Sequence, residues 1–198
     1  MDLLEKSLKV KEVFKELNVE IQEYLSQSQL GCFSGCGLCC ANPKVSASIL
    51  EFLPLAFELY HSNKAEETLS LLSEGTEEKY CIMLNKLSVN GDAGNCTSYQ
   101  NRGLICRLFA SSARKNKNGE KELLVCKKIK DGKRELFQAT SEAIKKDLPV
   151  PVGSDYYSRL YQIDFNLTNE NLPINLAIKN AIEQVLRYYY YIEEGNAV

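Results

Sequence analysis

The 198-residue chain has few of the side chains on which most catalytic and metal sites depend. It contains one histidine, no tryptophan and two methionines. A single histidine excludes metal sites built from several imidazoles, and a Ser-His-Asp or Cys-His catalytic centre could use only His61. Since His61 follows Tyr60 near the end of an expected helix, we expect it at the surface or in a cap rather than as a ligand.

Long hydrophobic runs are also missing. The most apolar stretch, residues 49–60, is interrupted by Glu51 and Glu58. A membrane-spanning helix needs about 18 or more consecutive apolar residues, and a secretory signal needs an uncharged apolar segment near the N-terminus. Charged residues recur throughout the N-terminal segment. We therefore expect a cytoplasmic protein without a membrane partner, in which thiols stay reduced.

Neither sign of charge is in large excess. The formal net charge is -2, which argues against a nucleic-acid-binding protein. The charge is unevenly spread, because residues 102–134 carry a net charge of +8 and the rest of the chain -10. This basic segment is either a solvated lysine-rich surface, or it offsets negative charge packed beside it or meets an anionic protein partner.

Against these absences stand eight cysteines, and a reducing compartment leaves metal ligation as the main use for clustered thiols. Four of them lie within nine residues, and they are Cys32, Cys36, Cys39 and Cys40. Gly31, Gly35 and Gly37 are interleaved with them and permit the tight backbone turns that let sulfurs face one metal. The segment 31–43 is therefore predicted to be an irregular, metal-binding loop.

The other four cysteines are spread along the chain, at Cys81, Cys96, Cys106 and Cys126. Basic residues accompany them: Arg102 and Arg107 lie near Cys106, and Lys127 and Lys128 follow Cys126. A tetrathiolate zinc site or an oxidised four-iron cluster carries a net charge near -2, which such cations could neutralise. Eight thiols divide naturally into two four-thiolate sites. Cys81 could instead be a buried apolar residue.

These two groups of residues resemble the CxxCxxCC cysteine-cluster family, often called YkgJ-like, which is described as a zinc- or iron-chelating domain. The resemblance covers about residues 30–128 and implies that all eight cysteines are metal ligands. It also matches Tyr99, Arg102 and Arg107, which we expect to contact the bound centre. One position departs from the family, because Gly103 stands where proline usually follows the arginine. This loosens the turn but removes no ligand.

The predicted function is therefore a cysteine-cluster protein holding one or two centres, either iron–sulfur, of the 4Fe-4S type, or zinc. Adjacent Cys39 and Cys40 favour a cluster over a plain zinc ribbon. Two alternatives stay open. Cys32-x-x-x-Cys36-x-x-Cys39 has the spacing of radical S-adenosylmethionine enzymes, and flagellin lysine methylases also resemble this family. Cys36 and Cys39 could also form the active pair of a thiol–disulfide redox protein.

The fold is predicted to be mainly α-helical, a single domain over 1–198 in which helices pack around a cysteine-rich centre at 31–128. Ser48 and Glu51 fit a capping box at the start of one helix. Apolar periodicity predicts the other helices, over residues 3–25, 64–73, 133–147 and 173–193. One short hairpin is predicted, with strands 105–111 and 123–129 and a turn near Lys117-Asn118-Gly119, which would bring Cys106 and Cys126 to the same end.

Overall fold

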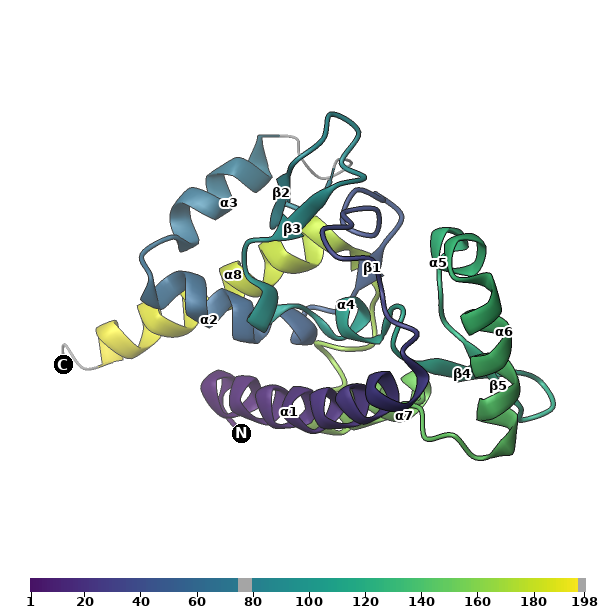
Figure 1. The fold of residues 1–198 in the computed structure, drawn as a ribbon. Coiled ribbons are helices and arrows are strands. Elements are labelled where there is room, and N and C mark those ends of the chain that lie inside the picture. Colours follow the sequence, from purple (N-terminus) through teal and green to yellow (C-terminus); the bar gives the residue numbers. More distant parts are fainter. Residues whose placement is uncertain (75–79, 196–198) are drawn as a thin grey trace. The chain divides into compact units, whose positions relative to one another are not determined.

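The computed structural model describes residues 1–74 and 80–195, with side chains described up to residue 192. The described chain is mainly helical with short strands, as predicted (Figure 1). Its helices are α1 (Leu3–Ser28), α2 (Leu53–His61), α3 (Ala65–Ser73), α4 (Leu104–Leu108), α5 (Lys127–Gly132), α6 (Arg134–Ala143), α7 (Gly153–Ile163) and α8 (Ile174–Gly195). The strands are β1 (Ser46–Ala47), β2 (Leu84–Lys86), β3 (Gly94–Cys96), β4 (Ala113–Lys115), β5 (Lys121–Leu123) and β6 (Leu172–Pro173). Short 3-10 helices are η1 (Leu50–Phe52), η2 (Tyr99–Asn101) and η3 (Ile144–Lys146).

The chain divides into two compact units. Unit 1 comprises Met1–Lys11, Gly35–Gly103 and Leu160–Val198, and unit 2 comprises Glu12–Ser34 and Leu104–Arg159. Helices α1 and α7 contribute residues to both units. No helix in the described part of the chain is long and apolar enough to cross a membrane.

Helices α2, α3 and α8 pack together to form the core of unit 1 (Figure 1). The predicted capping box is present only in part. The Ser48 amide donates a hydrogen bond of 2.9 Å to the buried Glu51 Oε1, but the Ser48 hydroxyl donates to the same carboxylate oxygen, and the N-cap residue of α2 is Phe52. Pro54 falls in the first turn of α2, where a missing N–H costs no hydrogen bond. The buried side of α8 consists of small and branched residues, namely Ala177, Ile178, Ala181, Ile182 and Val185.

A two-stranded antiparallel sheet, β1–β6, precedes α8. Ser46 pairs with Pro173, and the Ile174 amide donates to the Val45 carbonyl over 3.0 Å. Pro173 therefore ends a strand one residue before the helix, whereas periodicity placed it in the first helical turn. The start of α8 is set by residues distant in sequence, which periodicity cannot show.

Unit 2 contains two small buried clusters between its helices and the β4–β5 hairpin. Ile129 of α5 packs with Leu30 and Ala110, and Phe33 packs against this group. The second cluster joins Tyr24 of α1 to residues from β4, η3 and the segment before α7, namely Ala113, Ile144 and Val150. The helix predicted over 133–147 is confirmed as α6 followed by η3.

The predicted strands 105–111 and 123–129 are wrong in extent. A hairpin is present, but it pairs only Ala113–Lys115 with Lys121–Leu123, and the residues on either side form α4 and α5. Leu104, Arg107 and Leu108 are all buried, and this spacing of three and four residues is the helical rather than the strand period. Short apolar runs do not distinguish the two periods. Cys106 and Cys126 nevertheless flank the open end of one hairpin, where the Ala110 amide donates to the Leu124 carbonyl over 2.8 Å.

The β2–β3 hairpin and helix α7 are among the elements that were not predicted. The β2–β3 hairpin pairs Leu84 with Cys96, and its turn contains Gly91 at a φ of 69°, a left-handed conformation that glycine adopts readily. Helix α7 carries Tyr156 and Leu160 as buried residues four positions apart. The signals were the Asn90-Gly91 dipeptide, which is typical of hairpin turns, and this helical spacing.

Candidate metal centre

The two units hold different shares of the eight cysteines. Unit 1 contains Cys36, Cys39, Cys40, Cys81 and Cys96. Unit 2 contains Cys32, Cys106 and Cys126. All eight lie within the described residues as thiols, with no disulfide among them. The tight group of four that the sequence suggested is therefore divided, since Cys32 belongs to one unit and its three neighbours to the other.

In unit 1 the cysteine loop is fixed to the β2–β3 hairpin by its backbone. Cys36 forms an antiparallel bridge with Ala93, and on either side of it Gly37 N donates to Asp92 O over 3.1 Å and Gly94 N donates to Gly35 O over 2.9 Å. A Cβ atom at Gly37 would overlap the carbonyl oxygen of Gly91. Glycine is therefore required at this position by close backbone approach, and the loop is held against the hairpin turn.

The remaining cysteines of unit 1 reach this loop through backbone hydrogen bonds. The Cys81 amide donates to the Cys40 carbonyl over 2.8 Å, and the Leu84 amide donates to the Cys81 carbonyl over 2.9 Å. Leu84 in turn pairs with Cys96 across the hairpin. The Cys40 and Cys96 thiols are close enough to that of Cys81 to influence its ionisation. Three thiols from three separate segments therefore lie in one neighbourhood.

Backbone amides point at two of these sulfurs. The Met83 amide hydrogen-bonds the sulfur of Cys81, and the Ser98 amide hydrogen-bonds that of Cys96. In each case the donor lies two residues after the cysteine, so the two segments repeat one local arrangement. An N–H directed at sulfur stabilises the thiolate form, which is the form that binds metals. Such hydrogen bonds also tune the reduction potentials of iron–sulfur centres.

The surroundings of these thiols oppose ionisation when no cation is bound. The pKa of Cys81 is raised to about 12, with burial as the largest cause; the Met83 amide lowers it and the neighbouring Cys40 and Cys96 thiolates raise it. Burial also raises the pKa of Cys96, while the Ser98 amide and the Arg102 guanidinium lower it. A bound cation would supply the positive charge that these thiolates lack, so metal binding would release their protons. The all-sulfur donor set suits zinc or iron rather than magnesium or calcium.

The structure brings these segments together without forming a ligand cage. Among the described residues, no three His, Cys, Asp or Glu side chains are gathered closely enough to hold one metal ion. The donor chemistry and the segment arrangement fit a thiophilic centre, and the centre itself stays a prediction.

Tyr99 and Arg102, two of the predicted contact residues, form one local motif in unit 1. The Arg102 guanidinium lies 3.6 Å from the centre of the Tyr99 ring, and its Nε donates to the Tyr99 carbonyl over 3.1 Å. Stacking on an aromatic ring holds an arginine in place without neutralising it. Arg102 therefore keeps its charge beside Cys96, as expected from the sequence for a cation that offsets thiolate charge.

Arg107, the third predicted contact residue, lies in unit 2 and is only 5% exposed. Its Nη1 donates to Asn18 Oδ1 over 2.9 Å, and the guanidinium lies 4.5 Å from the centre of the Phe14 ring. These contacts join α4 to α1 inside unit 2. A role for Arg107 toward a metal centre stays a prediction.

The cysteines of unit 2 have a different environment. Cys32 is exposed, and Cys126 precedes the first turn of α5 in an extended conformation. The next residue after Cys32, Phe33, lies under Lys133, whose Nζ is 4.9 Å from the ring centre and donates to the Gly31 carbonyl over 2.8 Å. Lysines therefore accompany these cysteines, as the basic segment predicted.

His61 is the last residue of α2 and is exposed, as expected for a surface residue near a helix end. Its Nε2 lies 2.9 Å from the Tyr189 hydroxyl of α8. This contact was not predicted from the sequence, and neither were the amides of Met83 and Ser98. The position of those two amides, two residues after a cysteine, is a signal that could have identified them.

The fold and the site define a mainly helical protein whose cysteine-bearing loops carry an all-sulfur donor set. A family model described as "CxxCxxCC: Putative zinc- or iron-chelating domain" matches residues 31–129, which is half of the chain and includes all eight cysteines. The chain belongs to this family. Comparison with curated proteins and with solved structures found no match.

Gly103, where the resemblance led us to expect proline, lies against buried side chains. A Cβ atom at this position would lie 2.8 Å from Phe52 Cζ and 3.3 Å from Glu51 Oε2. Phe52 therefore fills the space that a side chain at 103 would need, and glycine accommodates it.

Proposed function

We propose that this protein holds an iron–sulfur cluster through cysteine thiolates of unit 1, drawn from Cys36, Cys39, Cys40, Cys81 and Cys96. The family is one of zinc- or iron-chelating domains, and the choice of an iron–sulfur cluster is our proposal. The observation that carries it is the backbone pairing that brings the segments of Cys40, Cys81 and Cys96 together, with an amide hydrogen bond to the sulfur of Cys81 and another to that of Cys96.

Three features support a cluster over a zinc ion. A structural zinc site uses four ligands, and unit 1 offers five thiols, of which Cys39 and Cys40 are adjacent. Amide hydrogen bonds to sulfur and a nearby guanidinium are means by which proteins tune and stabilise the charge of an iron–sulfur cluster. Arg102 stands beside Cys96 as such a cation. The three cysteines of unit 2 remain candidate ligands on the evidence of the sequence.

The test is anaerobic purification of the full chain followed by quantification of iron, acid-labile sulfide and zinc, together with a visible spectrum. We expect iron and sulfide in matching amounts and a broad visible absorption that bleaches on reduction. Zinc alone would refute the cluster and retain metal binding. A folded, colourless protein without metal would refute both.

Two variants sharpen this experiment. Cys81→Ser removes a converging thiol and should abolish the visible absorption. Asn95→Ser alters an exposed side chain that alternates with Cys96 along β3 and should leave the absorption unchanged. Equal loss in both variants would mean that disturbance of the hairpin, rather than loss of a ligand, removes the centre.

The alternatives predict different results for the same material. Binding of S-adenosylmethionine to the iron-loaded protein would favour the radical-enzyme alternative. A stable metal-free protein that forms a reversible Cys36–Cys39 disulfide would favour the thiol–disulfide alternative.

A further inference from the structure

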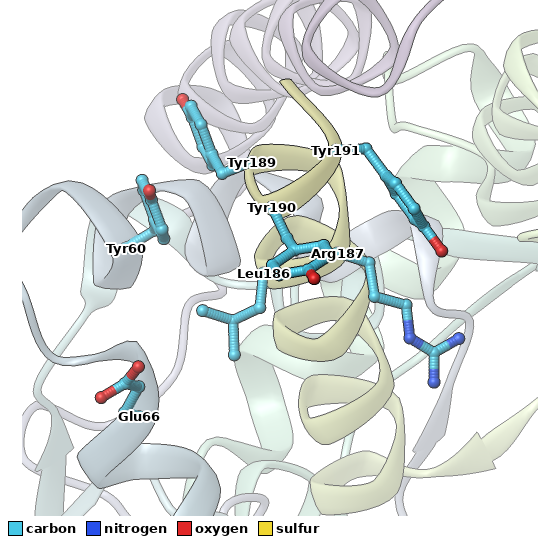
Figure 2. Close-up of a pocket in the computed structure, with 7 residues that line it drawn as sticks. All are labelled: Tyr60, Glu66, Leu186, Arg187, Tyr189, Tyr190 and Tyr191. Atoms are coloured by element: carbon cyan, nitrogen blue, oxygen red, sulfur yellow. The ribbon is translucent and has the colours of Figure 1, made fainter. Parts of the chain in front are cut away.

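An open pocket of about 560 Å³ lies along the C-terminal half of α8 in unit 1, with α2 and α3 forming its other side (Figure 2). Leu186 and Tyr190 lie between its two sides in Figure 2. The tyrosines at the end of α8 are prominent at the surface: Tyr190 is 57% exposed and Tyr191 is 70% exposed. Tyrosine is enriched at protein–protein interfaces relative to the rest of the protein surface.

One side of the pocket is held in place by aromatic contacts. The Tyr60 and Tyr189 rings stack in parallel, with centres 3.9 Å apart and an interplanar angle of 2°, and His61 holds the Tyr189 hydroxyl. Because these side chains are fixed on each other, the pocket is preformed rather than dependent on rearrangement. A preformed surface loses less conformational entropy when it binds.

The pocket carries one charge of each sign on opposite sides. Glu66 of α3 lies on one side and Arg187 of α8 on the other, with Leu186 and Tyr190 between them (Figure 2). Both charged residues are exposed. Within residues 1–74 and 80–192, neither side chain forms an ion pair.

We propose that this face docks a second copy of the chain across a two-fold axis. A two-fold interface is formed by the same surface on both copies. If one residue contacts a second residue of the other copy, the same contact occurs again with the two copies exchanged. Rotation by half a turn over the Leu186–Tyr190 floor places Glu66 of each copy opposite Arg187 of the other. The exposed Tyr190 side chain of each copy then meets the pocket of the other, and both charges are neutralised.

Charge complementarity selects this occupant over others. Glu66 would repel a small anion in the pocket, and Arg187 would repel a small cation. A ligand with a single charge of either sign is therefore repelled by one of these two residues. A partner must present an acid and a base in reversed order across an apolar centre. A second copy of this surface does so by symmetry, without any further requirement on its sequence.

The test is sedimentation velocity on the full chain, isolated with its metal content, over a dilution series. The wild-type chain should dimerise reversibly. Glu66→Arg and Arg187→Glu each place like charges at both ends of the interface and should weaken dimerisation about tenfold. Tyr190→Ser should weaken it at least as much, because it removes aromatic area from the centre.

Mixing the two charge-reversed variants gives the decisive result. In a mixed dimer the new arginine of one chain faces the new glutamate of the other, and the second end keeps the native Glu66–Arg187 pair. Two chains that each dimerise poorly should therefore form a dimer together. Glu67→Arg and Lys64→Glu change the net charge equally on exposed residues outside the pocket and should dimerise like the wild type.

Four outcomes would overturn the proposal. They are a wild-type chain that stays monomeric at every concentration, a dimer that tolerates all three pocket substitutions, an equal loss in the two control variants, and a mixture that fails to dimerise although circular dichroism shows both chains folded. Binding of a zwitterionic small molecule by a strictly monomeric chain would assign the pocket to that ligand instead.

Discussion

The two units place their cysteines in contrasting surroundings. In unit 1 the cysteine loop is tied to a hairpin, Cys81 is buried, and backbone amides and Arg102 face the sulfurs. In unit 2 Cys32 is exposed and Cys126 leads into a lysine-rich helix. Spacing in the sequence does not reveal the boundary between the units, because Cys32 and Cys36, four residues apart, lie on either side of it.

Metal removal should produce the largest difference between the two units. Ligation free energy of structural metal sites is large, about 10–16 kcal/mol for zinc in small domains, and it stabilises the segments that carry the ligands. Chelation should therefore abolish hydrogen-exchange protection at residues 35–41 and 81–96 while α6 of unit 2 keeps its protection. Hydrogen exchange with mass spectrometry measures this directly. Uniform loss of protection in all helices would contradict the contrast.

The close contact between Gly37 and the Gly91 carbonyl gives the next largest effect. Gly37→Ala should lower the free energy of unfolding by about 1–3 kcal/mol, because backbone rather than a flexible side chain blocks the new methyl group. Gly35→Ala provides the comparison. Its Cβ would meet no atom within 4 Å, and only its φ of +67° opposes the change, at a cost of about 1 kcal/mol. Urea unfolding should rank the two variants in this order; the reverse ranking would contradict the tight loop packing.

The two arginines of the cysteine motif should separate stability from metal binding. Arg107→Leu removes the partly buried hydrogen bond to Asn18 and should lower the free energy of unfolding by about 1–3 kcal/mol. Arg102 lies beside Cys96. Arg102→Leu should therefore leave the thermal stability of the metal-free protein nearly unchanged, while the variant retains metal less well. Thermal unfolding and metal analysis of both variants provide the comparison. Loss of metal by Arg107→Leu without loss of stability would contradict this separation of roles.

The smallest effect concerns a pH-dependent contact within unit 1. Lys6 Nζ lies 2.6 Å from Asp164 Oδ2. Burial raises the pKa of Asp164, but the Lys6 and Leu167 hydrogen bonds outweigh it and leave the pKa below its ordinary value of 3.8. Because the folded-state pKa is lowered, the stabilisation is present above pH 3.8 and is lost as pH falls through the folded-state pKa.

Asp164→Asn should therefore cost about 0.5–1 kcal/mol at neutral pH and progressively less in acid, as judged by urea unfolding at several pH values. Asp155→Asn is a matched comparison in unit 2, since its contact with Lys115 is 3.8 Å long and exposed, and it should cost less. An equal cost at neutral and acid pH would show that the Asp164 carboxylate charge does not carry the effect.

Elements governed by local sequence could be predicted, and those governed by distant contacts could not. Helix α8 follows from its apolar period, and the Ser48–Glu51 hydrogen bond follows from the three-residue spacing of these side chains. The strand predicted at 105–111 became a helix because Leu104 and Leu108 are buried by tertiary packing that periodicity does not contain. The cysteines themselves were identifiable from residue type and spacing, whereas their division between two units depends on backbone pairing such as that of Cys36 with Ala93.

Metal analysis of two triple variants tests the central claim most directly. One variant replaces Cys40, Cys81 and Cys96 of unit 1 with serine, and the other replaces Cys32, Cys106 and Cys126 of unit 2. After identical anaerobic purification, we expect the unit 1 variant to contain no iron or sulfide and the unit 2 variant to retain most of both. Retention of the full iron content by the unit 1 variant, together with its loss from the unit 2 variant, would contradict the assignment of the centre to unit 1.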